Sequence, residues 1–343
     1  MKQSGGQGSV NLQGQTVSVH VGITAVEAAE LMLSVGRSNL VEMQGLAKQI
    51  VDERLESFTD RFVQSVEARA PGVLQAVQDP DVQYTLFAAQ RDYARSGAEN
   101  LGETLIDLLV ARCAEKTGSL RAIVLNEAVT TVGRLTPGQV NALTCFWLVT
   151  RVRGLSMQNL DGLVNWLRTN VVPATADLPS HSAAYEHLSY CGCAQIQVTA
   201  ISLGDAWAKT YPGLFARGMT REEIPEDLRD VSALFTQCLT DPEKLQVNAL
   251  DADAAVMTAT QAGFPERSEV LSQLLLNNVK AADVVEAQVI GLIPELAGLA
   301  DLWTSTPMQN LGLSSVGIAL AHANWTRLAG KSTGLDVWIP DGA

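Results

Sequence analysis

The sequence predicts a mainly α-helical protein: a two-lobed body of many helices with a short N-terminal β segment and a short C-terminal strand. Three observations predict this fold class. Apolar residues recur every three or four positions from Ile23 onward, helix-capping residues, Gly and Pro divide that pattern at short intervals, and residues 1–22 alternate between apolar and polar. With 343 residues, 47% of them hydrophobic, the chain is long enough for one large or two ordinary domains.

Residues 1–22 are predicted to form a β arm. Val10 and Leu12, and later Val17 and Val19, are each separated by one polar residue, and Gly14 lies between the two pairs. Two short strands bury too little surface to be stable alone, so this arm needs to pair with the protein's own body or with copies of itself. A flexible polar tail is the alternative.

Two helices follow the arm. Thr24 and Glu27 form a capping box for the first, and Gly36 is predicted to end it. A long helix is predicted over residues 38–70, where the helical spacing continues as far as Pro71. At 1.5 Å per residue its length is ~50 Å, so it is either the spine of a bundle or a partner-facing element. We favour the spine.

Five shorter helices complete the predicted N-terminal lobe, residues 23–172. Each begins near a capping residue or a proline and carries an apolar face. Because the connections are short, consecutive helices are expected to pack antiparallel. These helices are predicted over residues 79–97, 99–115, 119–132, 136–153 and 156–167, the last one capped by Ser156.

Residues 172–180 contain two prolines and no helical period, which predicts a linker between the lobes. The C-terminal lobe, residues 181–343, has a looser pattern, and residues 191–203 fit either a strand or a helix. Five helices are predicted in this lobe: residues 181–190, a helix that begins at Asp241 and Pro242, and residues 265–278, 281–303 and 314–330. Pro294 is expected to kink the fourth of them, and residues 335–339 are predicted to form a short strand.

The cluster that most resembles a metal site is His181, His187, Cys191 and Cys193. Zinc binds imidazoles and thiolates, and His187 and Cys191 are four residues apart and so share one face of a helix. Structural zinc sites separate paired cysteines by about two to four residues, whereas only Gly192 separates these two. We therefore expect a tightly packed turn here, with no metal and no cofactor.

No catalytic residue is assigned from the sequence. The chain has no phosphate-binding glycine loop, no G-x-S-x-G elbow and no H-E-x-x-H motif. His322 lies in a run of small residues and is expected to be a core histidine. The polar cluster Arg91, Asp92, Tyr93 and Arg95 is expected to form a solvated or interhelical ion-pair face.

The charge balance argues against nucleic acid and membranes as partners. Lys and Arg total 24 against 37 Asp and Glu, and the resulting net charge of −13 repels phosphate and anionic lipid. No segment reaches the ~18 apolar residues that span a bilayer, and we expect no secretory signal. Five cysteines, an odd number, are typical of a reducing compartment, so we expect a cytoplasmic protein.

Four segments are distinctive as a set: DPDVQYTLFAAQRDYARSG (79–97), LGETLIDLLVARC (101–113), IVLNEAVTTVGRLTPGQVNALT (123–144) and LSSVGIALAHANWTRLAG (313–330). Through them, and through DVWI near its end, the chain resembles a bacterial family of uncharacterised proteins. Members carry a short Gly/Asn/Gln-rich N-terminal segment before a helical body. The resemblance spans nearly the whole chain and implies one chain-long architecture but no particular activity.

We expect an interaction protein whose β arm pairs with the arms of neighbouring subunits, giving a homo-oligomer or filament. A role in sensing or defence would suit such a bacterial protein. One alternative is an enzyme of unrecognised type with an inter-lobe pocket or metal site. Another is a scaffold that binds a helix of a partner protein along residues 38–70. The arm's dry side is expected to carry Val10, Leu12, Val17 and Val19, and the enzyme's pocket would lie near His187, Cys191, Cys193 or His322.

Overall fold

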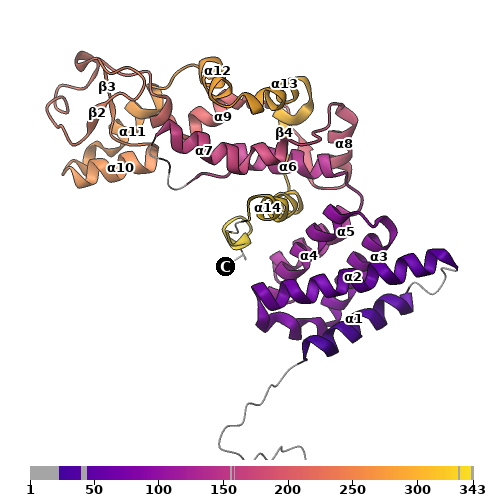
Figure 1. Ribbon diagram of the computed structural model, residues 1–343. Helices are drawn as coiled ribbons and strands as arrows, with labels where there is room; N and C mark the ends of the chain where they lie inside the picture. Colours follow the sequence, from indigo (N-terminus) through magenta and orange to yellow (C-terminus); the bar gives the residue numbers. More distant parts are fainter. Residues whose placement is uncertain (1–22, 40–44, 155–156, 158, 331–332, 341–343) are drawn as a thin grey trace, which may run out of the picture.

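The computed structural model describes residues 23–39, 45–154, 157, 159–330 and 333–340 (Figure 1). Over these residues the chain is mainly helical, as predicted, and its strands form short antiparallel pairs. Helices α1 to α5 gather in one group, α6 to α13 belong to a second, and α14 lies between the two groups. The predicted β arm, residues 1–22, lies outside the described residues.

The first group begins with the predicted capping box. The Thr24 amide donates to Glu27 Oε2 at 2.9 Å, and the Glu27 amide donates to Thr24 Oγ1 at 3.2 Å. Asp79 and Ser119, where two of the predicted helices begin, cap these helices through bonds to backbone amides of the first turn. The group comprises α1 (Ala25–Asn39), α2 (Leu46–Arg69), the 3₁₀ helix η1 (Pro71–Gln78), α3 (Pro80–Ser96), α4 (Glu99–Ala114) and α5 (Leu120–Val132).

Two predictions in this group are wrong. Gly36 does not end its helix, and the helix predicted from Ser38 begins only at Leu46, after Gly45, whose φ is 61°. Gly36 instead gives α1 room to pack, because a Cβ there would lie 3.2 Å from Gln90 Oε1 and 3.3 Å from a Leu55 methyl carbon. A glycine inside a helix can therefore mark a close contact as well as an end.

The second group is built on α6 (Pro137–Thr150), which is buried along most of its length. Thr136 and Gln139 form a capping box at its start, where the sequence predicts a helix from residue 136. The predicted cap Ser156 lies outside the described residues; the next helix begins at Leu160 and is capped by Asn159, whose Oδ1 accepts from the Gly162 amide at 2.9 Å. The other helices of this group are α7 (Leu160–Asn170), η2 (Val172–Thr175), α8 (Ser182–Tyr190), α9 (Leu203–Thr210), α12 (Ala282–Leu292) and α13 (Ala297–Ser305). The predicted kink at Pro294 is thus a break between α12 and α13.

A small unit with its own apolar cluster extends from this group (Figure 1). It contains β2 (Phe235–Gln237), β3 (Leu245–Val247), α10 (Ala252–Gln261) and α11 (Ser268–Asn277), joined to the rest through η3 (Pro212–Phe215) and neighbouring loops. The helix predicted from Asp241 and Pro242 is wrong, because these residues form the turn of the β2–β3 hairpin. The Lys244 amide donates to the Asp241 carbonyl at 3.0 Å, and the Cys238 amide to the Lys244 carbonyl at 2.9 Å.

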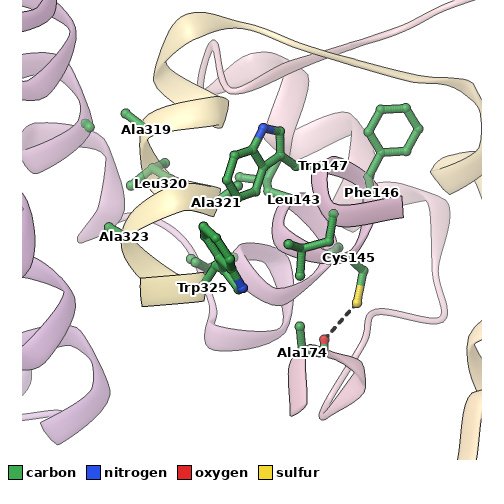
Figure 2. Close-up of a cluster of buried hydrophobic side chains, with 14 of the residues drawn as sticks. Leu143, Cys145, Phe146, Trp147, Ala174, Ala319, Leu320, Ala321, Ala323 and Trp325 are labelled. Carbon is green, nitrogen blue, oxygen red and sulfur yellow. Dashed lines mark hydrogen bonds between the residues drawn. The ribbon is translucent and has the colours of Figure 1, made fainter. Parts of the chain in front are cut away.

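Helix α14 (Ser315–Ala329) lies within the predicted range 314–330, with Ser314 as its N-terminal cap and Gly330 at its end, and it packs on α4, α5 and α6. Figure 2 shows Trp325 of α14 beside Trp147 of α6, and the two rings meet edge to face at 5.5 Å. The predicted C-terminal strand is wrong, since Leu335–Val337 form a 3₁₀ turn that brings Trp338 within 5.0 Å of the Trp147 ring. One continuous core therefore contains side chains from both sides of residues 172–180.

Candidate functional site

The cysteine and histidine candidates lie where α8 turns into β1 (Ala194–Ile196). His187 is in the last turn of α8, Cys191 follows the helix, and Gly192 makes the turn with a φ of 74°. Cys191 Sγ lies 3.5 Å from His187 Nε2, and the buried Cys193 Sγ is directed to the Cys191 carbonyl at 3.8 Å. His181 is at the opposite end of α8, so the structure brings together only three of the four candidates.

Gln139 selects the tautomer of the neutral His187 ring. Its Oε1 accepts from the Thr136 amide at 3.0 Å, so its Nε2 is the donor that contacts the Ala184 carbonyl at 2.7 Å and His187 Nδ1 at 3.1 Å. His187 Nδ1 is therefore an acceptor, and the ring proton of the neutral histidine is on Nε2, facing Cys191. An imidazole that activates a thiol needs a free nitrogen on that side, so this pair is not arranged as a nucleophile and base.

Burial also makes the neighbouring thiol unreactive. It raises the pKa of Cys193 to about 12, so the thiolate that would act as nucleophile or metal ligand is scarce at neutral pH. Within the described part of the chain, no group of three or more His, Cys, Asp or Glu side chains is placed to hold a metal ion. Chemistry at His187, Cys191 and Cys193 thus has little support from their geometry.

An open strand edge follows this cluster directly. β1 pairs antiparallel with β4 (Leu311–Leu313), with Gln195 opposite Gly312. The Ser314 amide donates to the Cys193 carbonyl at 3.1 Å and the Gln197 amide to the Asn310 carbonyl at 2.7 Å, so the odd-numbered residues of this strand face β4. The amide and carbonyl of Ile196 consequently point to the other edge, where no strand pairs with β1 among the residues that the structure describes.

The side chains around this edge are unusually exposed and apolar. Ile196 is 43% exposed, Tyr190 is 83% exposed, and Val198 is as exposed as in an extended chain. The sequence pattern at residues 191–203 left strand and helix open, and it did not reveal that Ile196 and Val198 would face solvent. We call Tyr190, Ile196, Val198 and the outer edge of β1 the β1 edge.

A groove of about 1090 Å³ lies along α4, with α2 on one side and α14 on the other. Small and apolar side chains, among them Ile106, Val110 and Ala319, line its base. Ion pairs cross it from the carboxylates of α4: Glu99 to Arg61 and Asp107 to Arg69, both at 2.6 Å, and Glu103 to Arg327 at 3.5 Å. The sequence shows these acidic residues four positions apart on α4, but not the helix α14 that closes the groove.

His322 and Asp107 line this groove and titrate abnormally. Burial lowers the pKa of His322, although the Thr333 carbonyl, 2.6 Å from Nε2, and the charge of Asp107 act in the other direction. Burial raises the pKa of Asp107, and the hydrogen bond from Arg69 opposes that rise. His322 also contacts the rings of Trp147 and Trp325, so it lies at the margin of the core.

The predicted polar cluster on α3 is an ion-pair face. Arg91 Nε lies 3.4 Å and Arg95 Nη2 lies 4.0 Å from Asp92 Oδ1, and Arg95 also donates to the Gly133 carbonyl of the neighbouring helix end at 3.0 Å. Tyr93 points the other way, into the core, with its ring under the Arg61 guanidinium. This cluster joins α3 to α5 and has a structural explanation.

A family model matches residues 22–339 of the chain, which include the whole helical body. The chain belongs to this uncharacterised family. The predicted resemblance to a family without an established activity is thereby confirmed, and residues 1–21, nearly all of the segment predicted to be a β arm, precede the matched range. No curated protein and no solved structure matches the chain. Over the described residues, no helix is both long and apolar enough to cross a membrane.

Proposed function

We propose that the protein is a self-assembling interaction protein, in which the β arm joins neighbouring subunits into a homo-oligomer or filament. The observation that carries this proposal is the division of the chain at Ile23. From Ile23 onward the described residues bury their apolar side chains within the body, mostly in one large core and otherwise in smaller clusters, while the residues before Ile23 have the alternation of strands. Strand-patterned residues attached to a self-sufficient body are suited to pairing with another molecule.

Charge supports the same proposal. The whole chain has a net charge of −13, but residues 1–22 contain no Asp or Glu and carry Lys2. The remainder therefore has a charge of −14, and two such bodies repel each other at low salt. An arm of opposite sign is attracted to a neighbouring body, so it can offset part of that repulsion.

Removing residues 1–22 and measuring the mass by light scattering tests the proposal. We expect the intact protein to exceed 36.6 kDa, the mass of one chain, and the shortened protein to be monomeric. A full-length variant, Val17→Lys with Val19→Lys, is expected to behave in the same way, because charges on the dry side oppose strand stacking. An oligomer of unchanged size in both proteins would contradict the proposal.

An enzyme remains the second candidate, and the groove is the observation that favours it. Its volume is just above the usual upper limit of about 1,000 Å³ for small-molecule sites, and it contains two groups with shifted pKa values, His322 and Asp107. The groove is a better pocket for this hypothesis than the cluster at His187. A thermal-shift screen of small charged molecules tests it. A ligand of the groove would raise the melting temperature of the wild type and not of the variant Asp107→Leu.

A further inference from the structure

We infer that the β1 edge is the acceptor for the β arm of a neighbouring copy, which adds to β1 as a third strand. This inference rests on the proposed self-assembly and names the surface that receives the arm. The amide and carbonyl of Ile196 point away from β4, so an added strand would find backbone donors and acceptors already aligned. Such main-chain pairing needs an extended segment and only a loose side-chain match.

The arm has the pattern that this edge accommodates. Ile196 and Val198 are exposed apolar residues two positions apart, Ile196 as the last residue of β1 and Val198 at the bend that follows it. The arm offers Val10 with Leu12, and Val17 with Val19, at the same spacing of two. In a ladder, such residues stand opposite one another on one face, and apolar cross-strand pairs contribute about 0.2–1 kcal/mol each.

The position of Ile23 favours pairing between copies. α1, which begins just after Ile23, lies at the bottom of Figure 1, whereas β4, the partner of β1, lies in the upper group of helices. The arm therefore starts at the lower group of helices, whereas its acceptor is in the upper group. A contact between two different surfaces is heterologous, and repeating it produces a ring or an open filament.

The test uses full-length variants that remove one half of the contact at a time. Ile196→Pro removes the outward amide and leaves the bonds of Gln195 and Gln197 to β4 in place, and Val198→Lys adds a charge where the side chain is fully exposed. Val256→Lys, on α10, is the control, since Val256 is also exposed, at 44%. Circular dichroism and the melting temperature report on the fold, and light scattering reports the mass.

We expect both edge variants to be monomers of 36.6 kDa with the circular dichroism spectrum of the wild type and a cooperative melting transition, and the control to assemble like the wild type. Mixing Val198→Lys with the arm variant Val17→Lys/Val19→Lys is expected to give a 1:1 dimer. The Val198→Lys protein keeps an intact arm, the arm variant keeps an intact β1 edge, and only this one contact can form. A synthetic peptide of residues 9–21 is expected to reduce the mass of the wild type, which provides a readout even if Ile196→Pro does not fold.

The outcomes separate the two proposals. If the edge variants assemble like the wild type while the arm variant is monomeric, the β1 edge is not the acceptor, but self-assembly through the arm still holds. An arm variant that assembles like the wild type would overturn self-assembly through the arm, and the acceptor with it. A monomeric wild type would overturn both self-assembly and the β1 edge as acceptor for a neighbouring copy. This is also the result expected if the arm pairs with the body of its own chain.

Discussion

Gly317, in the first turn of α14, is expected to be intolerant of even one added methyl group. A Cβ at this position would lie 2.0 Å from the carbonyl oxygen of Cys193, the residue that precedes β1. This contact is between two backbones, which are also joined by the Ser314 hydroxyl at 3.0 Å from the same oxygen. Neither partner can rotate away, so Gly317→Ala must push α14 from β1.

Two opposing effects determine the size of the loss. Alanine in place of glycine in a helix contributes about 0.5–1 kcal/mol of stability. Overpacking a rigid contact costs about 1–3 kcal/mol of stability. We use the upper end of that range, because the added Cβ would lie closer than 3.0 Å to the Cys193 carbonyl oxygen. We therefore expect Gly317→Ala to lower the free energy of unfolding by about 2 kcal/mol.

Gly298→Ala is the matched control, because Gly298 is also in the first turn of a helix, α13, and a Cβ there would meet no atom within 4 Å. It is expected to raise the free energy of unfolding by about 0.5–1 kcal/mol. Urea denaturation followed by circular dichroism should thus shift in opposite directions for the two variants. Equal shifts of the same sign would show that α14 does not depend on close approach to Cys193.

Three further predictions concern single side chains. Burial lowers the pKa of His322 in the folded protein below its ordinary 6.5, so between these two pH values the unfolded chain binds more protons than the folded one. The free energy of unfolding of the wild type should therefore fall as the pH drops below 6.5, and that of His322→Gln should fall less steeply. Urea titrations at several pH values would measure both slopes. Arg112 is fully buried and donates to the half-exposed Asp81 at 2.5 Å and to the Asn126 side chain at 2.8 Å, so Arg112→Ala should cost about 1.5–3 kcal/mol in thermal or urea unfolding. Arg37→Ala, in an exposed pair, should cost less than about 1 kcal/mol. Burial raises the pKa of Cys113 to about 11, so a thiol reagent at pH 8 should modify it only after unfolding; rapid labelling of Cys113 in the native protein, mapped by mass spectrometry, would contradict this.

Local signals in the sequence predict the N-terminal helices well. The capping boxes at Thr24 and Thr136 and the left-handed caps at Gly97 and Gly330 act within a few residues, so they can be recognised without the tertiary structure. The same rule fails at Gly36, where the reason for a glycine is a contact with residues of α2 and α3. Local patterns therefore locate helix ends only where no close packing requires the same residue type.

The candidate site was less predictable because it depends on distant partners. Cys191 and His187 are close in sequence, but the side chain that fixes the histidine's proton, Gln139, comes from α6. The groove needs α14, more than 200 residues after α4 in the sequence, to complete it. Exposure of Ile196 likewise depends on how β1 pairs with β4, which no window of neighbouring residues reveals.

The position of α14 in the core has a consequence for synthesis in the cell. α6 buries its apolar surface against a helix that the ribosome produces near the end of the chain, from Ser315. At about 5–20 residues per second, translation from Thr150 to Ser315 takes roughly 8–33 s. During that interval Trp147 lacks its partner Trp325, so the nascent polypeptide exposes apolar surface that chaperones would bind until the last helix emerges.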